Sequence, residues 1–197
     1  MVKPIQWRNS LARREMRIAG FGGQGVVLSG QIVGQAVAVY NNEFAAFTQN
    51  YGPEARGGSC TAEIVADREA IGYPYLTKPQ VVVILSQDAY NKYGKDLEEE
   101  TQLIIDPDLV KPDSSQKHLF LAIPANRMAR DLGRVVVANI ILLGFLAAVS
   151  NFVSAEALRK SVLASVPKGT GEFNMKAFEI GYKYGLEHGL RSNGING

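Results

Sequence analysis

The stretch MRIAGFGGQGVVLSG, residues 16–30, decides the fold that this sequence predicts. Residues 16–19 make a short apolar strand, a run of glycines follows, and residues 26–40 carry apolar side chains at helical spacing. A strand and a helix joined by a G-x-G-x-x-G turn are typical of α/β folds. The chain is therefore expected to open with a strand, a tight turn and a helix.

Further strands and helices follow this unit in a regular order. Residues 81–85, VVVIL, form a continuous apolar run typical of a central strand covered on both faces. The other strands are expected at residues 44–48, 59–66, 103–105 and 119–123, and the other helices at residues 87–97, 134–149, 154–165 and 171–188. This order predicts an α/β fold with a single doubly wound, mainly parallel sheet flanked by helices, and a helical C-terminal part.

One domain is expected to account for nearly the whole chain. No linker divides residues 16–190, so we expect them to form one folded unit. Residues 1–15 are basic and lack the apolar run of a secretory signal, which indicates a flexible N-terminal arm. Residues 191–197 are expected to be a disordered tail.

The composition argues against several classes of protein. A formal net charge of +2 over 197 residues gives no broad positive surface for nucleic acid or an anionic membrane. The most apolar stretch, residues 135–149, is shorter than the roughly 20 residues that span a bilayer. The single cysteine, Cys60, excludes an intrachain disulfide and a four-thiolate iron–sulfur cluster, and the two histidines have no neighbouring ligands that suggest a metal site. We therefore expect a cytoplasmic protein that binds no nucleic acid, membrane or metal by itself.

The glycine turn, GFGGQG at residues 20–25, has three interpretations. Glycines let an anion approach the amides at a helix N-terminus, so the turn favours a nucleotide. A dinucleotide site usually also has an acidic residue at the end of the second strand, where this sequence has Thr48, Gln49 and Asn50. The three interpretations are therefore a dinucleotide site that lacks this acid, a site for a different ligand or a partner chain, and glycines that only pack the helix on the sheet.

A second glycine-rich loop, YGPEARGG at residues 51–58, joins two expected strands around a single arginine, Arg56. A guanidinium with flanking glycines suits a carboxylate or a phosphate, whereas the plainer interpretation pairs Arg56 with Glu54 or Glu63 on the surface. Loops beyond the carboxyl ends of the strands form the ligand crevice of an open α/β sheet. Because both glycine-rich segments follow strands, we expect them to share one site.

The two glycine-rich segments together resemble the gamma chain of the 2-oxoacid:ferredoxin oxidoreductases. The resemblance continues through Tyr73-Pro74, residues 86–90, Asp106 and residues 137–144, so it covers roughly residues 16–190. Of these motifs, the segment at residues 51–58 is the more specific.

This resemblance implies a function that is divided among several chains. The family converts a 2-oxoacid and CoA to an acyl-CoA by oxidative decarboxylation, with thiamine diphosphate, Mg²⁺, iron–sulfur clusters and ferredoxin. It implies partner alpha and beta chains that bind thiamine, a cluster-bearing or ferredoxin-like partner, and CoA as a ligand that touches this chain or a neighbouring one. The residues expected to contact a ligand or a partner are Gly20, Gly22, Gly23, Gln24, Gly25, Tyr51, Arg56, Gly57, Gly58 and Asn139.

No residue of this chain is expected to be catalytic. The form of the loop at residues 51–58 resembles chains that serve 2-oxoglutarate, with pyruvate and 2-oxoisovalerate as alternatives. Two other functions stay open at this point. They are a free-standing oxidoreductase that binds a nucleotide at the glycine turn, and a purely structural subunit whose motifs pack against other chains.

Overall fold

The structure of the protein is a computed structural model, and it describes residues 13–53, 57–113 and 120–189. The predicted tail, residues 191–197, and most of the predicted arm lie outside the described residues. The first strand, β1, spans Arg14–Phe21. It begins two residues earlier than the strand expected from residue 16.

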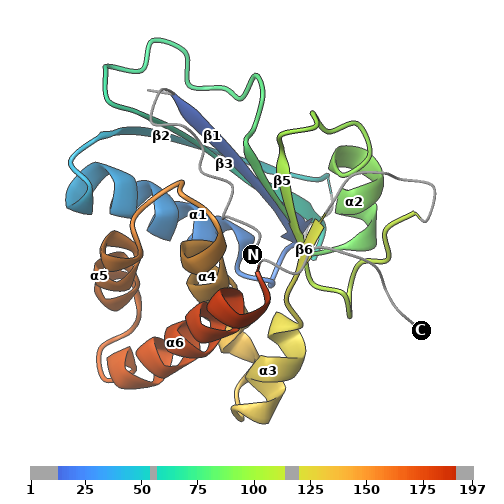
Figure 1. The fold of residues 1–197 in the computed structure, drawn as a ribbon, viewed down its shortest axis with the longest axis vertical. Helices are drawn as coiled ribbons and strands as arrows, with labels where there is room; N and C mark the ends of the chain where they lie inside the picture. The colour runs from blue at the N-terminus through green and yellow to red at the C-terminus, as the bar shows by residue number, and fades with distance from the viewer. Residues whose placement is uncertain (1–12, 54–56, 114–119, 190–197) are drawn as a thin grey trace.

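Within the described residues, one sheet of six strands forms the centre of the molecule (Figure 1). The strands after β1 are β2 Phe44–Tyr51, β3 Ser59–Asp67, β4 Val81–Ile84, β5 Gln102–Ile105 and β6 Phe120–Ala122. Their order is β2-β3-β1-β4-β5-β6. The strands β1, β4, β5 and β6 are parallel, and β3 is antiparallel to both of its neighbours. The prediction of a mainly parallel sheet is confirmed, with β3 as the exception.

Helices cover both faces of this sheet, as a doubly wound fold requires. They are α1 Val26–Gln35, which continues into the π-helical η1 Ala36–Tyr40, α2 Gln87–Tyr93, α3 Ala125–Asp131, the 3-10 turn η2 Val135–Val137, α4 Ala138–Val149, α5 Ala155–Ser165 and α6 Gly171–His188. Figure 1 shows α1, α4, α5 and α6 on one side of the sheet and α2 on the other. The helical C-terminal part is confirmed, and α3 is a helix that the sequence pattern did not predict.

The strand β4 shows why the sheet is stable between two layers of helices. Its four residues are all buried. Val81 and Val83 belong to the core under α1 and α4, whereas Val82 and Ile84 belong to the core under α2. Full burial of one such side chain stabilises the fold by about 1.5–3 kcal/mol. A continuous run of branched side chains is therefore needed here, because a polar residue on either face would lie in a core.

Two glycines set the distance between α4 and α6, the pair of helices that pack most extensively. A side-chain carbon at Gly144 would collide with the carbonyl of Phe178, and one at Gly181 would collide with the carbonyl of Ile141. The backbones of α4 and α6 can approach this closely only because both residues lack a side chain. This contact fixes α4, whose first residues line the site described next.

Candidate ligand-binding site at the carboxyl end of the sheet

The structure brings the two glycine-rich segments together at the carboxyl end of β1. Gly22 N donates a hydrogen bond to Gly58 O at 2.8 Å, and Gly57 lies beside Gly22 with a positive φ of 67°. The second segment is a hairpin loop, closed by the bond from Gly52 N to Ser59 O at 2.6 Å. The two segments therefore lie at one place, as predicted. Arg56 lies outside the described residues.

Gly25 joins this turn to the helix α1 and also contacts Asn139 of α4. Its φ of 75° is left-handed, which favours glycine. A side-chain carbon at Gly25 would come within 2.8 Å of Asn139 Cβ, so the asparagine packs directly on the glycine. This contact places the Asn139 amide next to the N-terminus of α1.

An open cavity of about 230 Å³ lies at this point, between the ends of β1, β4 and β6. Its lining includes Gly23, Gln24, Leu85, Asn126, Val136 and Asn139. The helix that follows β1 covers one face of the sheet and the helix that follows β4 covers the other (Figure 1). The cavity therefore lies at the topological switch point of the sheet, which is where open α/β sheets bind ligands.

Asn139 is the polar side chain in this cavity that lacks a protein partner. It is 6% exposed and makes no hydrogen bond to any residue that the structure describes. Because the cavity is open, the Asn139 amide is not sealed from solvent, and a ligand there can take its hydrogen bonds in place of water. The helix N-terminus beside it adds backbone N–H groups, because no side chain caps the first turn of α1. Together they suit a polar or anionic group.

Gln24 lines the cavity and also makes hydrogen bonds within the chain that the sequence did not predict. Phe21 N donates to Gln24 Oε1 at 2.6 Å, and Gln24 Nε2 donates to Leu85 O at 2.7 Å. The side chain thus links the end of β1 to the end of β4. Gln24 shapes the wall of the cavity, while both ends of its amide are already hydrogen-bonded to the backbone.

Asp106 holds Asn126, which lines the cavity, in place. Its carboxylate is fully buried at the end of β5 and accepts hydrogen bonds from Asn126 N at 3.0 Å and Asn126 Nδ2 at 2.9 Å. Asp108 N donates to the other carboxylate oxygen at 3.0 Å. Sequence reasoning did not single out Asn126 as a site residue. A signal existed, because Asn126 lies at the start of the helix that follows a strand of the parallel sheet.

The remaining predicted residues lie around the cavity and not in it. Gly20 is the penultimate residue of β1 and packs against Gln24. Tyr51 ends β2 and is 65% exposed at the same edge of the sheet.

Val135 and Val136, which were not predicted, are 52% and 81% exposed at the rim of the cavity. Exposed apolar residues at a rim are typical of a surface that another chain or a ligand covers.

The single cysteine and the candidate metal ligands bear on the chemistry that the described residues offer. Burial raises the pKa of the Cys60 thiol, which lies in β3. No cluster of histidine, cysteine or acidic residues that could hold a metal ion occurs in the described part of the chain. In the same residues, no helix combines the length and the apolar character needed to cross a membrane.

Comparison with known proteins identifies the family. A family model described as pyruvate ferredoxin/flavodoxin oxidoreductase matches residues 15–184. The chain belongs to this family. The resemblance that the two glycine-rich segments carry is therefore confirmed.

Similar members of the family match along nearly their whole length. The 2-oxoglutarate synthase subunit KorC of Methanocaldococcus jannaschii is 45% identical over 178 residues, which cover 89% of this chain and 95% of the relative. KorC of Methanothermobacter marburgensis is 40% identical over 182 residues, with coverage of 89% and 98%. The crystal structure of a keto/oxoacid ferredoxin oxidoreductase gamma subunit from Geobacter sulfurreducens superposes with a TM-score of 0.78 at 34% identity, with coverage of 90% and 98%. The fold is thus that of a gamma subunit.

Proposed function

We propose that this chain is the gamma subunit of a 2-oxoglutarate:ferredoxin oxidoreductase. Such an enzyme oxidatively decarboxylates 2-oxoglutarate in the presence of CoA, which yields succinyl-CoA and carbon dioxide and passes two electrons to ferredoxin. The choice of 2-oxoglutarate over pyruvate or 2-oxoisovalerate rests on the two KorC relatives at 40–45% identity. The partner chains are expected to decide substrate choice, because the described residues of this chain offer no catalytic group for it.

The redox cofactors are proposed to lie on partner chains in the cytoplasm. An iron–sulfur cluster needs several thiolates, and the only cysteine of this sequence is buried in β3 with a raised pKa. The residues of this chain therefore do not fit a cluster. Thiamine diphosphate with Mg²⁺ is assigned to alpha and beta chains, and the clusters to a further chain.

The cavity beside the glycine turn is proposed to bind a polar part of CoA. The observation that carries this proposal is the amide of Asn139, which lines the cavity, has no partner among the described residues and lies at an uncapped helix N-terminus. The volume of about 230 Å³ is below the roughly 300–1,000 Å³ of a typical site for a whole small molecule. The chain would therefore contact only one part of CoA, with partner chains covering the rest.

Substitution of Asn139 in the assembled enzyme tests this proposal. Asn139→Asp keeps the shape of the side chain and places a negative charge where an anion is expected to bind. Loss of one hydrogen bond to a charged group costs about 1.5–3 kcal/mol, so the KM for CoA should rise roughly tenfold or more while the KM for 2-oxoglutarate stays the same. Arg56→Ala should change the KM for CoA in the same direction. Asn91→Asp on the exposed side of α2 is the matched control.

Each outcome separates the proposed function from its alternatives. Normal CoA kinetics in both the Asn139 and the Arg56 variants, with normal assembly, would mean that the motifs serve packing between chains only. Binding of NAD, NADP or flavin to the purified chain, measured by calorimetric titration, would instead support an independent nucleotide-binding protein. Coupled reduction of ferredoxin with 2-oxoglutarate, pyruvate and 2-oxoisovalerate would identify the substrate.

A further inference from the structure

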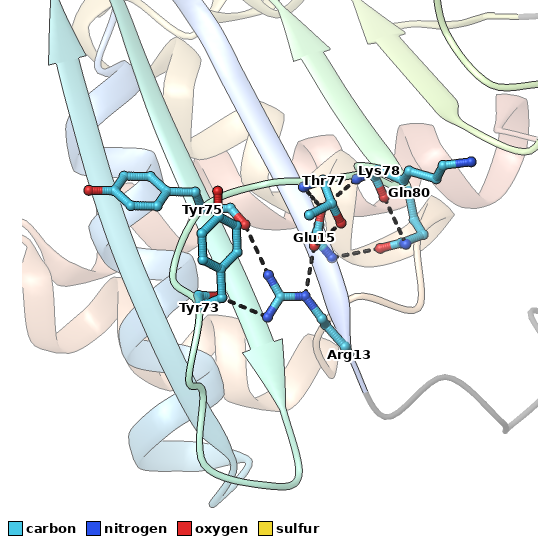
Figure 2. A network of polar contacts seen from close by, with 7 residues as sticks. All are labelled: Arg13, Glu15, Tyr73, Tyr75, Thr77, Lys78 and Gln80. Carbon is cyan, nitrogen blue, oxygen red and sulfur yellow. Dashed lines mark hydrogen bonds and ion pairs between the residues drawn. The ribbon is translucent and has the colours of Figure 1, made fainter.

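A second surface, far from the cavity, is built around a buried carboxylate. Glu15 lies in β1 and is 2% exposed. It accepts hydrogen bonds from Thr77 N at 2.6 Å, Thr77 Oγ1 at 2.9 Å and Lys78 N at 2.8 Å, and an ion pair joins it to Arg13 Nε at 2.8 Å (Figure 2). These donors belong mainly to the segment between β3 and β4, residues 68–80, which we call the Tyr73 loop. A loop without helix or strand is thus fixed to the sheet by one carboxylate.

Arg13 extends this network to the outer part of the Tyr73 loop. Its Nη1 donates to Tyr73 O and its Nη2 donates to Tyr75 O, both at 2.9 Å. Figure 2 shows the guanidinium between the two tyrosine carbonyls and Glu15. The backbone that carries the two tyrosines is therefore held in one conformation before any partner arrives, which lowers the entropic cost of binding.

The network presents two aromatic rings to the surface. Tyr73 and Tyr75 are each 55% exposed, and their rings meet edge to face with centroids 5.5 Å apart. Tyrosine is among the residues that contribute most to protein–protein binding when it becomes buried. Nothing among the described contacts requires these rings to lie outside, since none of the hydrogen bonds of the loop uses a hydroxyl of Tyr73 or Tyr75. The geometry therefore points to an interaction surface.

The exposed charges of the Tyr73 loop and of the segment joined to it indicate the chemistry of the partner. The ion pair from Lys78 Nζ to Glu98 Oε1 at 3.2 Å and the bond from Thr101 Oγ1 to Pro79 O at 2.9 Å join the Tyr73 loop to residues 94–101. The exposed charged residues of these two segments are the acids Glu69, Asp96, Glu98, Glu99 and Glu100 and the cations Arg68, Lys78 and Lys95. Five acids against three cations leave a local charge of −2, opposite in sign to the +2 of the whole chain.

We propose that Tyr73 and Tyr75, together with the acidic segment at residues 94–101 that is joined to the same loop, form the docking surface for an arginine- and lysine-rich patch on another subunit of the same oxidoreductase. Guanidinium and ammonium groups bind over tyrosine rings and pair with the neighbouring carboxylates. The proposal rests on the role of the chain as a subunit and is independent of the contact with CoA. The surface lies at the amino end of β1, about 20 Å from the glycine turn, because Phe21 is six positions along the strand from Glu15.

The test uses the whole complex, with this chain tagged and the partner chains captured through it at increasing salt. The double variant Tyr73→Ser/Tyr75→Ser should weaken capture at least about tenfold, because both rings are lost. Tyr73→Phe/Tyr75→Phe should retain most of the capture, because the ring faces remain. The matched control is Leu163→Ser/Leu186→Ser, which removes two apolar side chains of similar exposure, 49% and 58%, from the helical face.

Charge reversal tests the proposed partner chemistry separately. Glu99→Lys/Glu100→Lys should lower capture and weaken its dependence on salt, because the attraction between opposite charges is lost. Wild-type capture by the serine double variant would overturn the proposal, and so would a charge-reversed variant that binds more tightly. Loss of self-association alone, seen in sedimentation with partner capture intact, would mean that a second copy of this chain occupies the surface, which also overturns it. Complexes that do form with the serine variant should keep the normal KM for CoA, so a failed CoA proposal gives a different result.

Discussion

Replacing Glu15 by glutamine keeps the volume of the side chain and removes its charge. The carboxylate accepts three hydrogen bonds from Thr77 and Lys78 as well as the ion pair with Arg13. A glutamine has a single acceptor oxygen, and its NH₂ group would face donors. Hydrogen bonds to a charged group contribute about 1.5–3 kcal/mol each, so the loss of one or two should lower the free energy of unfolding by about 3 kcal/mol.

The effect should depend on pH in a defined direction. Burial alone would raise the pKa of Glu15, but the hydrogen bonds from Arg13, Thr77 and Lys78 outweigh it and hold the pKa below its ordinary value of 4.5. The carboxylate is thus more acidic in the folded chain than in the unfolded one. Its contribution to stability is complete above pH 4.5 and is lost as the pH falls through the folded pKa. The difference between wild type and Glu15→Gln should therefore shrink in acid.

Urea unfolding of the purified chain, at neutral pH and at steps below pH 4.5, measures both quantities. Glu98→Gln is the matched control, because Glu98 also forms an ion pair but its side chain is 56% exposed. That variant should change the free energy of unfolding by less than about 1 kcal/mol. A loss below about 1 kcal/mol for Glu15→Gln at neutral pH, or a loss that stays constant in acid, would refute the role assigned to this carboxylate.

Three further substitutions or reactions test the packing. Gly181→Ala should destabilise the chain by about 3 kcal/mol in urea unfolding, because the new methyl group collides with the Ile141 carbonyl, whereas Gly171→Ala at the start of the same helix should be nearly neutral. Gly25→Ala should cost about 1–2 kcal/mol or more, because φ is 75° and the neighbouring helix leaves no space; an unchanged urea midpoint would contradict this. Burial raises the pKa of the Cys60 thiol, so it should react with an aromatic disulfide reagent only as fast as the chain opens, and rapid labelling of the native chain would argue against this packing.

Local sequence patterns predicted most of the fold, because the burial of several elements requires a recognisable spacing of apolar residues. Residues 81–85 needed to be apolar at every position, since β4 lies between two cores, and the spacing in residues 171–188 gave the bounds of α6. The place of β3 between β2 and β1 was not predicted, because the alternation of a strand does not name its neighbours. The antiparallel direction of β3 relative to β2 was predictable from the sequence. Only seven residues separate β2 from β3, and a parallel connection needs a dozen or more.

Only those parts of the candidate site that lie close together in the sequence were predictable. The two glycine-rich segments were expected to share one site, and the bond from Gly22 to Gly58 shows that they meet. Ligand binding there stays a prediction. Asn126 and Val136 line the cavity together with Gly23 but lie about a hundred residues after it in the sequence. Only the order of the strands in the sheet brings these residues to the cavity. The hydrogen bonds of the Gln24 amide to Phe21 and Leu85 were not predictable, because a short motif does not reveal that the end of β4 lies beside it.

The two ends of strand β1 contact two different parts of the molecule. Its carboxyl end turns at Gly22 into the cavity at the switch point, and its amino end holds the Tyr73 loop through Glu15. Since about 20 Å of strand lies between them, a partner at the amino end leaves the cavity open to CoA. Substitutions at such a distance are expected to act independently. Combining Asn139→Asp with Tyr73→Ser/Tyr75→Ser should therefore add the two effects, a higher KM for CoA and weaker assembly. A combined variant whose KM for CoA depends on the tyrosines would show that docking also closes the cavity.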